Sequence, residues 1–141
     1  MSSYADSSFL VSLYAPDANS AGALQILPQL SPPIVITWLG ELELENAFEL
    51  RKFRRQIGAT EGRLGSDFRA DVSSGVVIVE PMTEAIYLQA RRLAATWTHT
   101  LGTRTLDIIH VAAATFLKAD VFLTFDRRQR NLAEAAGLVC L

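Results

Sequence analysis

A helix followed at once by a buried strand constrains the fold of this chain more than any other part of its sequence. Residues 103–126 read TRTLDIIHVAAATFLKADVFLTFD. The helical part holds one acid, Asp107, among apolar residues, and the apolar run from Val121 to Phe125 ends at a second acid, Asp126. A helix that leads directly into a buried strand is half of a βαβ unit, and such units build parallel sheets. The stretch therefore predicts an α/β fold.

The rest of the chain repeats this alternation of strands and helices. Short apolar runs that predict strands occupy residues 3–5, 34–37, 76–79, 121–125 and 138–141. Helical patterns fill the intervals, and Gly58 indicates a loop before a surface helix. We expect residues 1–141 to form one domain, a three-layer α/β/α sandwich around a central, mostly parallel five-stranded sheet.

Composition sets limits on the class of protein. At 141 residues and 50% hydrophobic content the chain can bury a substantial core. Its net charge of −2 gives no overall signal for nucleic-acid binding, although a local basic patch can suffice. The single cysteine, Cys140, has no intrachain partner, and no Cys/His cluster suggests zinc. Without an apolar run of roughly 18 residues or a signal-peptide pattern, we expect a soluble, cytoplasmic protein.

Acidic residues recur where the predicted strands end. Asp6 follows the first strand, Asp126 follows the fourth, and Asp107 lies in the first turn of the helix before it. In open parallel sheets, functional groups gather at the carboxyl ends of the strands. Each acid also has an ordinary structural interpretation, as a helix N-cap for Asp6 and Asp126 and as a helix-dipole partner for Asp107. The case for a site therefore depends on several acids meeting at one edge.

The helix after the second strand carries four glutamates, of which one is a candidate for this edge. Glu43 lies four residues before Ala47 and shares a face with residues of the buried type. Glu41, Glu45 and Glu49 follow one another at four-residue steps, which indicates a solvated face. Helical spacing alone favours Glu43 only modestly.

Carboxylates held close together repel one another unless a cation neutralises them. A site of carboxylates without histidine or cysteine ligands suits Mg²⁺, or Mn²⁺, which proteins bind beside substrate phosphates. Such an ion can activate water and stabilise the charge of an in-line phosphoryl displacement. If Asp6, Glu43, Asp107 and Asp126 converge, the chemistry indicated is phosphodiester hydrolysis.

Four segments, in order, resemble those of the PIN-domain nucleases: YADSS at 4–8, ELENA at 43–47, TLDIIHVAAA at 105–114 and LTFDRRQ at 123–129. Within that superfamily the chain is most similar to the VapC-type toxins of bacterial toxin–antitoxin pairs. The resemblance covers essentially the whole chain. It implies a Mg²⁺-dependent endoribonuclease that acts on RNA, is usually a homodimer, and is inhibited by a small antitoxin protein.

The resemblance also implies roles for individual residues. Asp6 and Asp107 match the acids that hold the metal directly, while Glu43 and Asp126 match those that complete the acidic cluster, in part through water. We therefore expect Asp6, Asp107 and Asp126 to bind the metal, and all four acids to take part in catalysis. Thr124 matches a hydroxyl residue that supports the ligand shell. The two neighbouring glutamates keep the choice of Glu43 open, although the Asn-Ala pair that follows it favours that residue.

Some features keep two interpretations. His110, three residues after Asp107, could reach the site, but we favour a histidine that is satisfied within the helical layer. Basic residues at 51, 52, 54, 55, 127, 128 and 130 are either hydrated cations at helix ends or local patches for RNA phosphates. The alternative to an enzyme is a PIN fold that binds RNA or a protein partner with little turnover.

Overall fold

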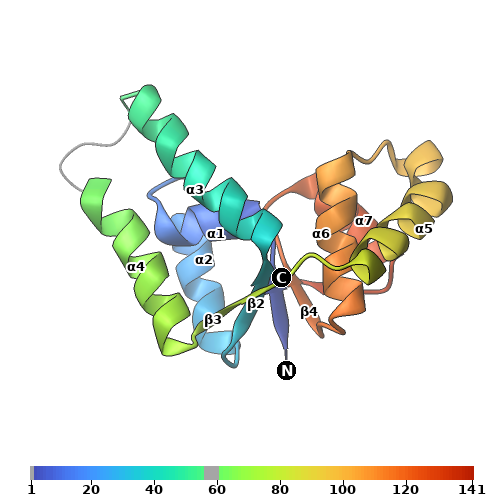
Figure 1. Cartoon of the computed structure of the whole chain (residues 1–141), viewed down its shortest axis with the longest axis horizontal. Helices are drawn as coiled ribbons and strands as arrows, with labels where there is room; N and C mark the ends of the chain where they lie inside the picture. Colours follow the sequence, from blue (N-terminus) through green and yellow to red (C-terminus); the bar gives the residue numbers. More distant parts are fainter. Residues whose placement is uncertain (1, 56–60) are drawn as a thin grey trace.

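A five-stranded sheet runs through the centre of the molecule (Figure 1). The computed structural model of the chain describes residues 2–55 and 61–141. The strand order is β3-β2-β1-β4-β5, and every neighbouring pair is parallel. The strands are β1 (Ser3–Ala5), β2 (Ile34–Thr37), β3 (Val77–Glu80), β4 (Val121–Leu123) and β5 (Val139–Cys140). The predicted α/β class is confirmed, with a sheet that is parallel at each of these pairings.

Helices cover both faces of the sheet and give the predicted three layers. One layer contains α1 (Ser7–Tyr14), α2 (Ser20–Ile26) with a 3₁₀ turn (Leu27–Gln29), α3 (Trp38–Phe53) and α4 (Glu61–Ser74). The other contains α5 (Glu84–Leu101), α6 (Thr105–Phe116) and α7 (Arg127–Ala135). Figure 1 shows α1–α4 on one side of the strands and α5–α7 on the other. The loop predicted at Gly58 lies outside the described residues.

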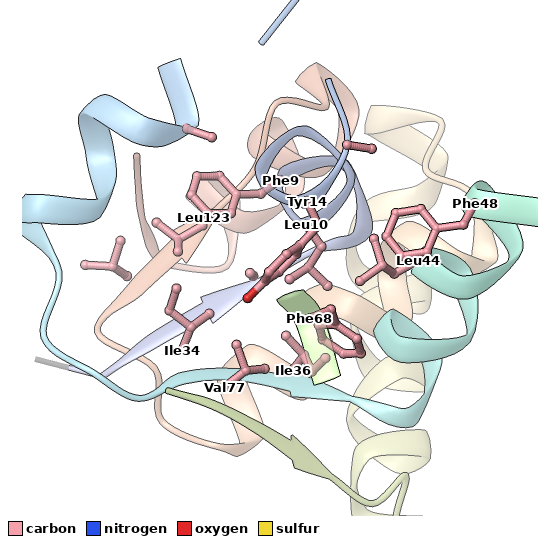
Figure 2. Packing of buried hydrophobic residues seen from close by; sticks show 14 residues of the cluster. Phe9, Leu10, Tyr14, Ile34, Ile36, Leu44, Phe48, Phe68, Val77 and Leu123 are labelled. Atoms are coloured by element: carbon pink, nitrogen blue, oxygen red, sulfur yellow. The ribbon is translucent and has the colours of Figure 1, made fainter. Parts of the chain in front are cut away.

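Alternating strand residues feed two separate cores. Ala5 and Leu123 face the layer of α1–α4, whereas their neighbours Tyr4 and Phe122 face α5–α7. Figure 2 shows the first core, in which Phe9 of α1 and other large side chains pack on the sheet. Because both faces are buried, the strands read as continuous apolar runs rather than alternating ones.

Strand and helix ends depart slightly from the predicted ranges. The third strand is shifted by one residue, to Val77–Glu80, and the last is shorter, at Val139–Cys140. The fourth ends at Leu123 rather than at residue 125, because the backbone N–H groups of Phe125 and Asp126 donate to the hydroxyls of Ser8 and Thr124 instead of to a neighbouring strand. Gly102, with φ of +64°, ends α5 in the left-handed conformation that glycine adopts most readily. In the described ranges, none of the helices has the length and apolar character needed to cross a membrane.

Candidate active site

The carboxyl ends of β1, β2 and β4 lie side by side because these strands are parallel neighbours. Asp6 follows β1, and its backbone N–H donates to the carbonyl of Leu123 at the end of β4, at 3.1 Å. Helices α1, α3 and α7 begin directly beyond this edge. The edge thus receives the side chains that follow the strands and those of the first turns of these helices.

Asp6 is fully buried and hydrogen-bonded at both carboxylate oxygens. Oδ1 accepts from the Ser8 hydroxyl at 2.7 Å and from the Phe9 backbone N–H at 2.9 Å. Oδ2 accepts from the hydroxyl of Thr124. Burial raises the pKa of Asp6, while the bonds from Thr124, Phe9 and Ser8 act in the opposite direction. Asp6 therefore caps α1, as one interpretation predicted, and also places a carboxylate at the sheet edge.

Thr124 joins Asp6 to Asp126. Its buried Oγ1 donates to Asp6 and accepts from the backbone N–H of Asp126 at 2.9 Å. Asp126 caps α7, since its Oδ1 accepts from the N–H groups of Arg128 at 2.7 Å and Gln129 at 3.1 Å. Among the described residues, nothing hydrogen-bonds the other oxygen, Oδ2. One hydroxyl thus holds the first acid and positions the backbone of the second.

Glu43 reaches the edge from α3. Its side chain is 24% exposed, and its Oε2 lies 2.6 Å from Nε2 of His110 on α6. Glu45 and Glu49 are exposed, and Glu41 is partly exposed on the same helix. Of these four glutamates, only Glu43 borders the cleft described next.

A cleft of about 510 Å³ lies beside the acids, between α1, α3 and the start of α7. Glu43 and Asp126 contribute carboxylates to its wall, Asn46 and Gln129 contribute amides, and Phe125 contributes a ring. Neither Asp6 nor Asp107 forms part of this wall, as far as the described residues go. Asp17 and Asn19 also border the cleft. Of the three bordering acids, the sequence pattern singles out Glu43 and Asp126, and it assigns no role to the amides.

Asp107 lies in the first turn of α6 and is 7% exposed. Its Oδ2 accepts from the backbone N–H of Arg104 at 3.3 Å, the helix-start interaction that was its ordinary interpretation. Its Oδ1 has no hydrogen-bond partner in the part of the chain that the structure describes. His110, one turn later, contacts Glu43, so α6 brings Asp107 to the same side of the molecule.

Several supporting residues escaped the sequence reasoning. Ser8 contacts both Asp6 and, at 3.3 Å, the hydroxyl of Thr124, and it accepts from the backbone N–H of Phe125. The hydroxyl of Tyr4 lies 3.0 Å from Nδ1 of His110. Ser8 could have been suspected from its place two residues after Asp6. Tyr4 could not, because a fully buried aromatic residue within a strand has the pattern of an ordinary core residue.

The donor chemistry of the four acids suits a hard divalent cation. Glu43, Asp107 and Asp126 each keep one carboxylate oxygen that no described residue hydrogen-bonds. Oxygen ligands without thiolate or imidazole are those that Mg²⁺ prefers. Within residues 2–55 and 61–141, however, no three acidic, imidazole or thiol groups are grouped tightly enough to share a metal ion. The acids would have to draw together around a bound cation.

The basic residues divide into two groups. Arg51 donates to the carbonyl of Pro16 at 2.8 Å, Lys52 pairs with Glu49 at 2.9 Å, and Arg130 donates to the carbonyl of Thr124 at 3.3 Å. The second group is exposed, and its guanidinium groups have no partner among the described residues: Arg54, Arg55, Arg127 and Arg128. Of this group, Arg127 and Arg128 follow Asp126 directly and begin α7 at the cleft.

Comparison with known proteins gives the same fold. The chain aligns over 98% of its length with Mycobacterium tuberculosis VapC20, described as a sarcin-ricin loop cleaving toxin, at 23% identity and a TM-score of 0.71, covering 97% of that chain. FitAcB of Neisseria gonorrhoeae matches at 13% identity and a TM-score of 0.69, over 99% of this chain and 96% of that one. VapBC-1 of nontypeable Haemophilus influenzae matches at 16% identity and a TM-score of 0.69, over 100% of this chain and 97% of that one.

Sequence comparison with curated proteins gives no significant match. The family model of the PIN domain, in contrast, matches residues 3–135, which include all four candidate acids. The chain therefore belongs to the PIN domain family.

Proposed function

We propose that this protein is a Mg²⁺-dependent endoribonuclease that hydrolyses RNA phosphodiester bonds, and that it is the toxin of a toxin–antitoxin pair. The observation that supports the proposal is the match to the PIN domain family, together with Asp6 and Asp126, which Thr124 joins at the carboxyl edge of the sheet, and Glu43, which borders the same cleft as Asp126. Glu43, Asp107 and Asp126 each keep one carboxylate oxygen that no described residue hydrogen-bonds. The similarity in fold to VapC20, which is described as a sarcin-ricin loop cleaving toxin, supports the same class of activity.

The chain's own residues take distinct parts in the proposed reaction. Asp6, Asp107 and Asp126 are the residues that would hold Mg²⁺. Thr124 holds the Asp6 carboxylate in place by donating a hydrogen bond to it, and that bond lowers the pKa of Asp6 against the larger effect of burial, which raises it. When bound, the ion supplies charge neutralisation and polarises the scissile phosphate. Glu43, with Oε1 free beside the cleft, orients the attacking water and accepts its proton.

RNA would enter along the cleft. Arg127 and Arg128 are exposed at the start of α7, where their charges can contact backbone phosphates. The amides of Asn46 and Gln129 and the ring of Phe125 border the cleft, and such groups hydrogen-bond or stack on unpaired bases. This arrangement supports single-stranded or loop RNA as the substrate, since the bases of a duplex are not accessible to such contacts.

We also propose a homodimer and a small antitoxin as partners, in the cytoplasm where RNA is available. Large apolar side chains are exposed on the two outer layers, including Phe53 at 83%, Leu42 at 63% and Tyr87 at 60%. Apolar surface of this kind supports association with another protein surface. Light scattering at increasing protein concentration would test the dimer, and a mass of one chain at all concentrations would contradict it.

The test of the enzyme is cleavage of a mixed pool of structured and single-stranded RNA by the purified protein. The pool is incubated with Mg²⁺, with EDTA, and with the Asp107→Asn variant as a control for contaminating nuclease. We expect cleavage that requires Mg²⁺ and is lost in the variant. A folded, inhibitor-free protein that cuts no RNA in the pool would favour the alternative, a PIN fold that binds RNA or protein without turnover.

A further inference from the structure

His110 is the only one of the two histidines of the chain that the fold buries, and both of its ring nitrogens are engaged. It is 0% exposed, whereas His99 is exposed near the end of α5. Nε2 lies 2.6 Å from Oε2 of Glu43, and Nδ1 lies 3.0 Å from the hydroxyl of Tyr4. A buried, satisfied histidine was the favoured interpretation of the sequence, but one of its partners is a candidate catalytic acid.

Hydrogen-bonding chemistry decides which nitrogen carries the proton. An ionised carboxylate only accepts, so Nε2 must donate to Glu43. In the tautomer with its one proton on Nε2, Nδ1 is the acceptor, and the Tyr4 hydroxyl donates to it. Burial raises the pKa of Tyr4, which keeps that hydroxyl protonated. Thr37, 3.3 Å from the tyrosine oxygen, completes the chain of bonds.

The chain of bonds is held by rigid parts of the fold. Tyr4 lies on the central strand β1, and its ring stacks on that of Phe122 of β4 at 5.8 Å between centroids. Thr37 ends β2 and precedes the first residue of α3. Gly40, in the first turn of α3, leaves the helix backbone close to the histidine, since a Cβ there would lie 3.8 Å from Cε1 of that ring. The imidazole therefore has little freedom to rotate.

We propose that His110 is a positioning residue that fixes the carboxylate of Glu43 at the cleft. Its Nε2–H occupies Oε2, which leaves Oε1 to face the water that attacks RNA. The bond also joins α6 of one helical layer to α3 of the other at the sheet edge. This inference rests on the proposed ribonuclease function, and it assigns the orientation of the glutamate to a buried group on another helix.

Two alternative roles predict different behaviour. If His110 only filled the core, its removal would lower stability and would change activity equally whether or not Glu43 were intact. If His110 acts through Glu43, its removal must have no further effect on activity once Glu43 has been replaced. Outer hydrogen-bond partners of this kind typically change activity by about 10–100-fold when removed.

The experiment measures kcat and KM for RNA cleavage in a double-mutant cycle. The variants are His110→Leu, His110→Gln, Glu43→Gln and the double variant His110→Leu/Glu43→Gln, with His99→Gln as the matched control. We expect His110→Leu to lower kcat about 10–100-fold with little change in KM, and the amide of His110→Gln to restore part of the loss. The double variant should equal Glu43→Gln, because the two residues act as one unit.

A second measurement on the full chain does not depend on activity. Nitrogen-15 NMR of the imidazole identifies which nitrogen is protonated. We expect a proton on Nε2 whose signal shifts in Glu43→Gln and stays unchanged in Glu45→Gln. An unprotonated Nε2 would overturn the proposal, as would additive kcat losses in the cycle. If the wild-type protein cleaves no RNA, the proposed function fails, whereas the NMR result still decides whether His110 holds Glu43.

Discussion

Replacing Thr124 by valine would test how strongly the fold depends on the hydroxyl between two acids. Valine matches threonine in shape and β-branching, so the change removes the hydroxyl and little else. It leaves Oδ2 of the buried Asp6 without a donor and the backbone N–H of Asp126 without its acceptor. An unpaired buried polar group costs about 1–3 kcal/mol. For two such groups, one of them partly exposed, we expect the free energy of unfolding to fall by about 2–4 kcal/mol.

The loss is measurable by thermal and chemical denaturation of the metal-free protein. For a domain of this size, a few kcal/mol corresponds to a fall in Tm of roughly 7–14 °C. Thr124→Ser, which keeps the hydroxyl, should recover most of that loss. Thr100→Val is the matched control, because Thr100 is exposed and its hydroxyl has no partner among the described residues. Its effect should stay within about 0.5 kcal/mol.

The stability difference between wild type and Thr124→Val should change with pH in a definite direction. Burial raises the pKa of Asp6, and the bond from Thr124 lowers it, so Thr124→Val raises it further. With a raised pKa the native state binds more protons than the unfolded chain, and its stability rises as pH falls through the native pKa. The difference between wild type and variant should therefore shrink on acidification. A difference that grows at low pH, or an effect of Thr124→Val that equals that of Thr100→Val, would show that the Thr124 hydroxyl does not stabilise the buried Asp6 carboxylate.

Other substitutions test the remaining parts of the site. Asp107→Asn should keep the fold, as seen by circular dichroism, and should raise Tm at neutral pH by relieving repulsion among the acids; a lower Tm would contradict this. Glu41→Gln should leave cleavage almost unchanged while Glu43→Gln lowers its rate about 100-fold or more, and the reverse would show that the wrong face of α3 was assigned. Arg127→Ala/Arg128→Ala should weaken RNA binding and lower the slope of log K against log salt by about 0.7 for each phosphate that is no longer neutralised. An unchanged slope would place RNA elsewhere. Mg²⁺ at about 100 times its dissociation constant should stabilise the protein by about 2.7 kcal/mol, and no shift in Tm up to millimolar Mg²⁺ would count against a metal site.

Much of the fold could be predicted because its signals are local. Continuous apolar runs such as Ile34–Thr37 indicate strands buried on both faces, and the acids that follow strands also cap the next helices. A residue between the end of a strand and the start of the next helix both caps that helix and lies at the carboxyl edge, so Asp6 and Asp126 could be located from the sequence. The strand ends were less predictable, as after β4, where the backbone N–H of Phe125 donates to the hydroxyl of Ser8 instead of to a neighbouring strand.

The parts that could not be predicted depend on interactions between distant segments. Glu43 was favoured over its neighbours only modestly by spacing, because helical periodicity does not reveal which element lies opposite. The partner that distinguishes it, His110, comes 67 residues later on the opposite layer. The basic residues were indistinguishable in sequence for the same reason: Arg51 reaches the carbonyl of Pro16, whereas Arg127 remains exposed without a partner in the described part of the chain.

If four acids at one sheet edge perform metal-dependent RNA cleavage, each of the four must be required for it. The most direct measurement is the single-turnover cleavage rate in Mg²⁺ of four variants, each of which removes one charge: Asp6→Asn, Glu43→Gln, Asp107→Asn and Asp126→Asn. Asp67→Asn and Glu45→Gln, at exposed acids, are the controls. We predict a loss of about 100-fold or more for each of the four and rates near wild type for the controls. A wild-type rate in any of the four, or an equal loss in the controls, would contradict the assignment.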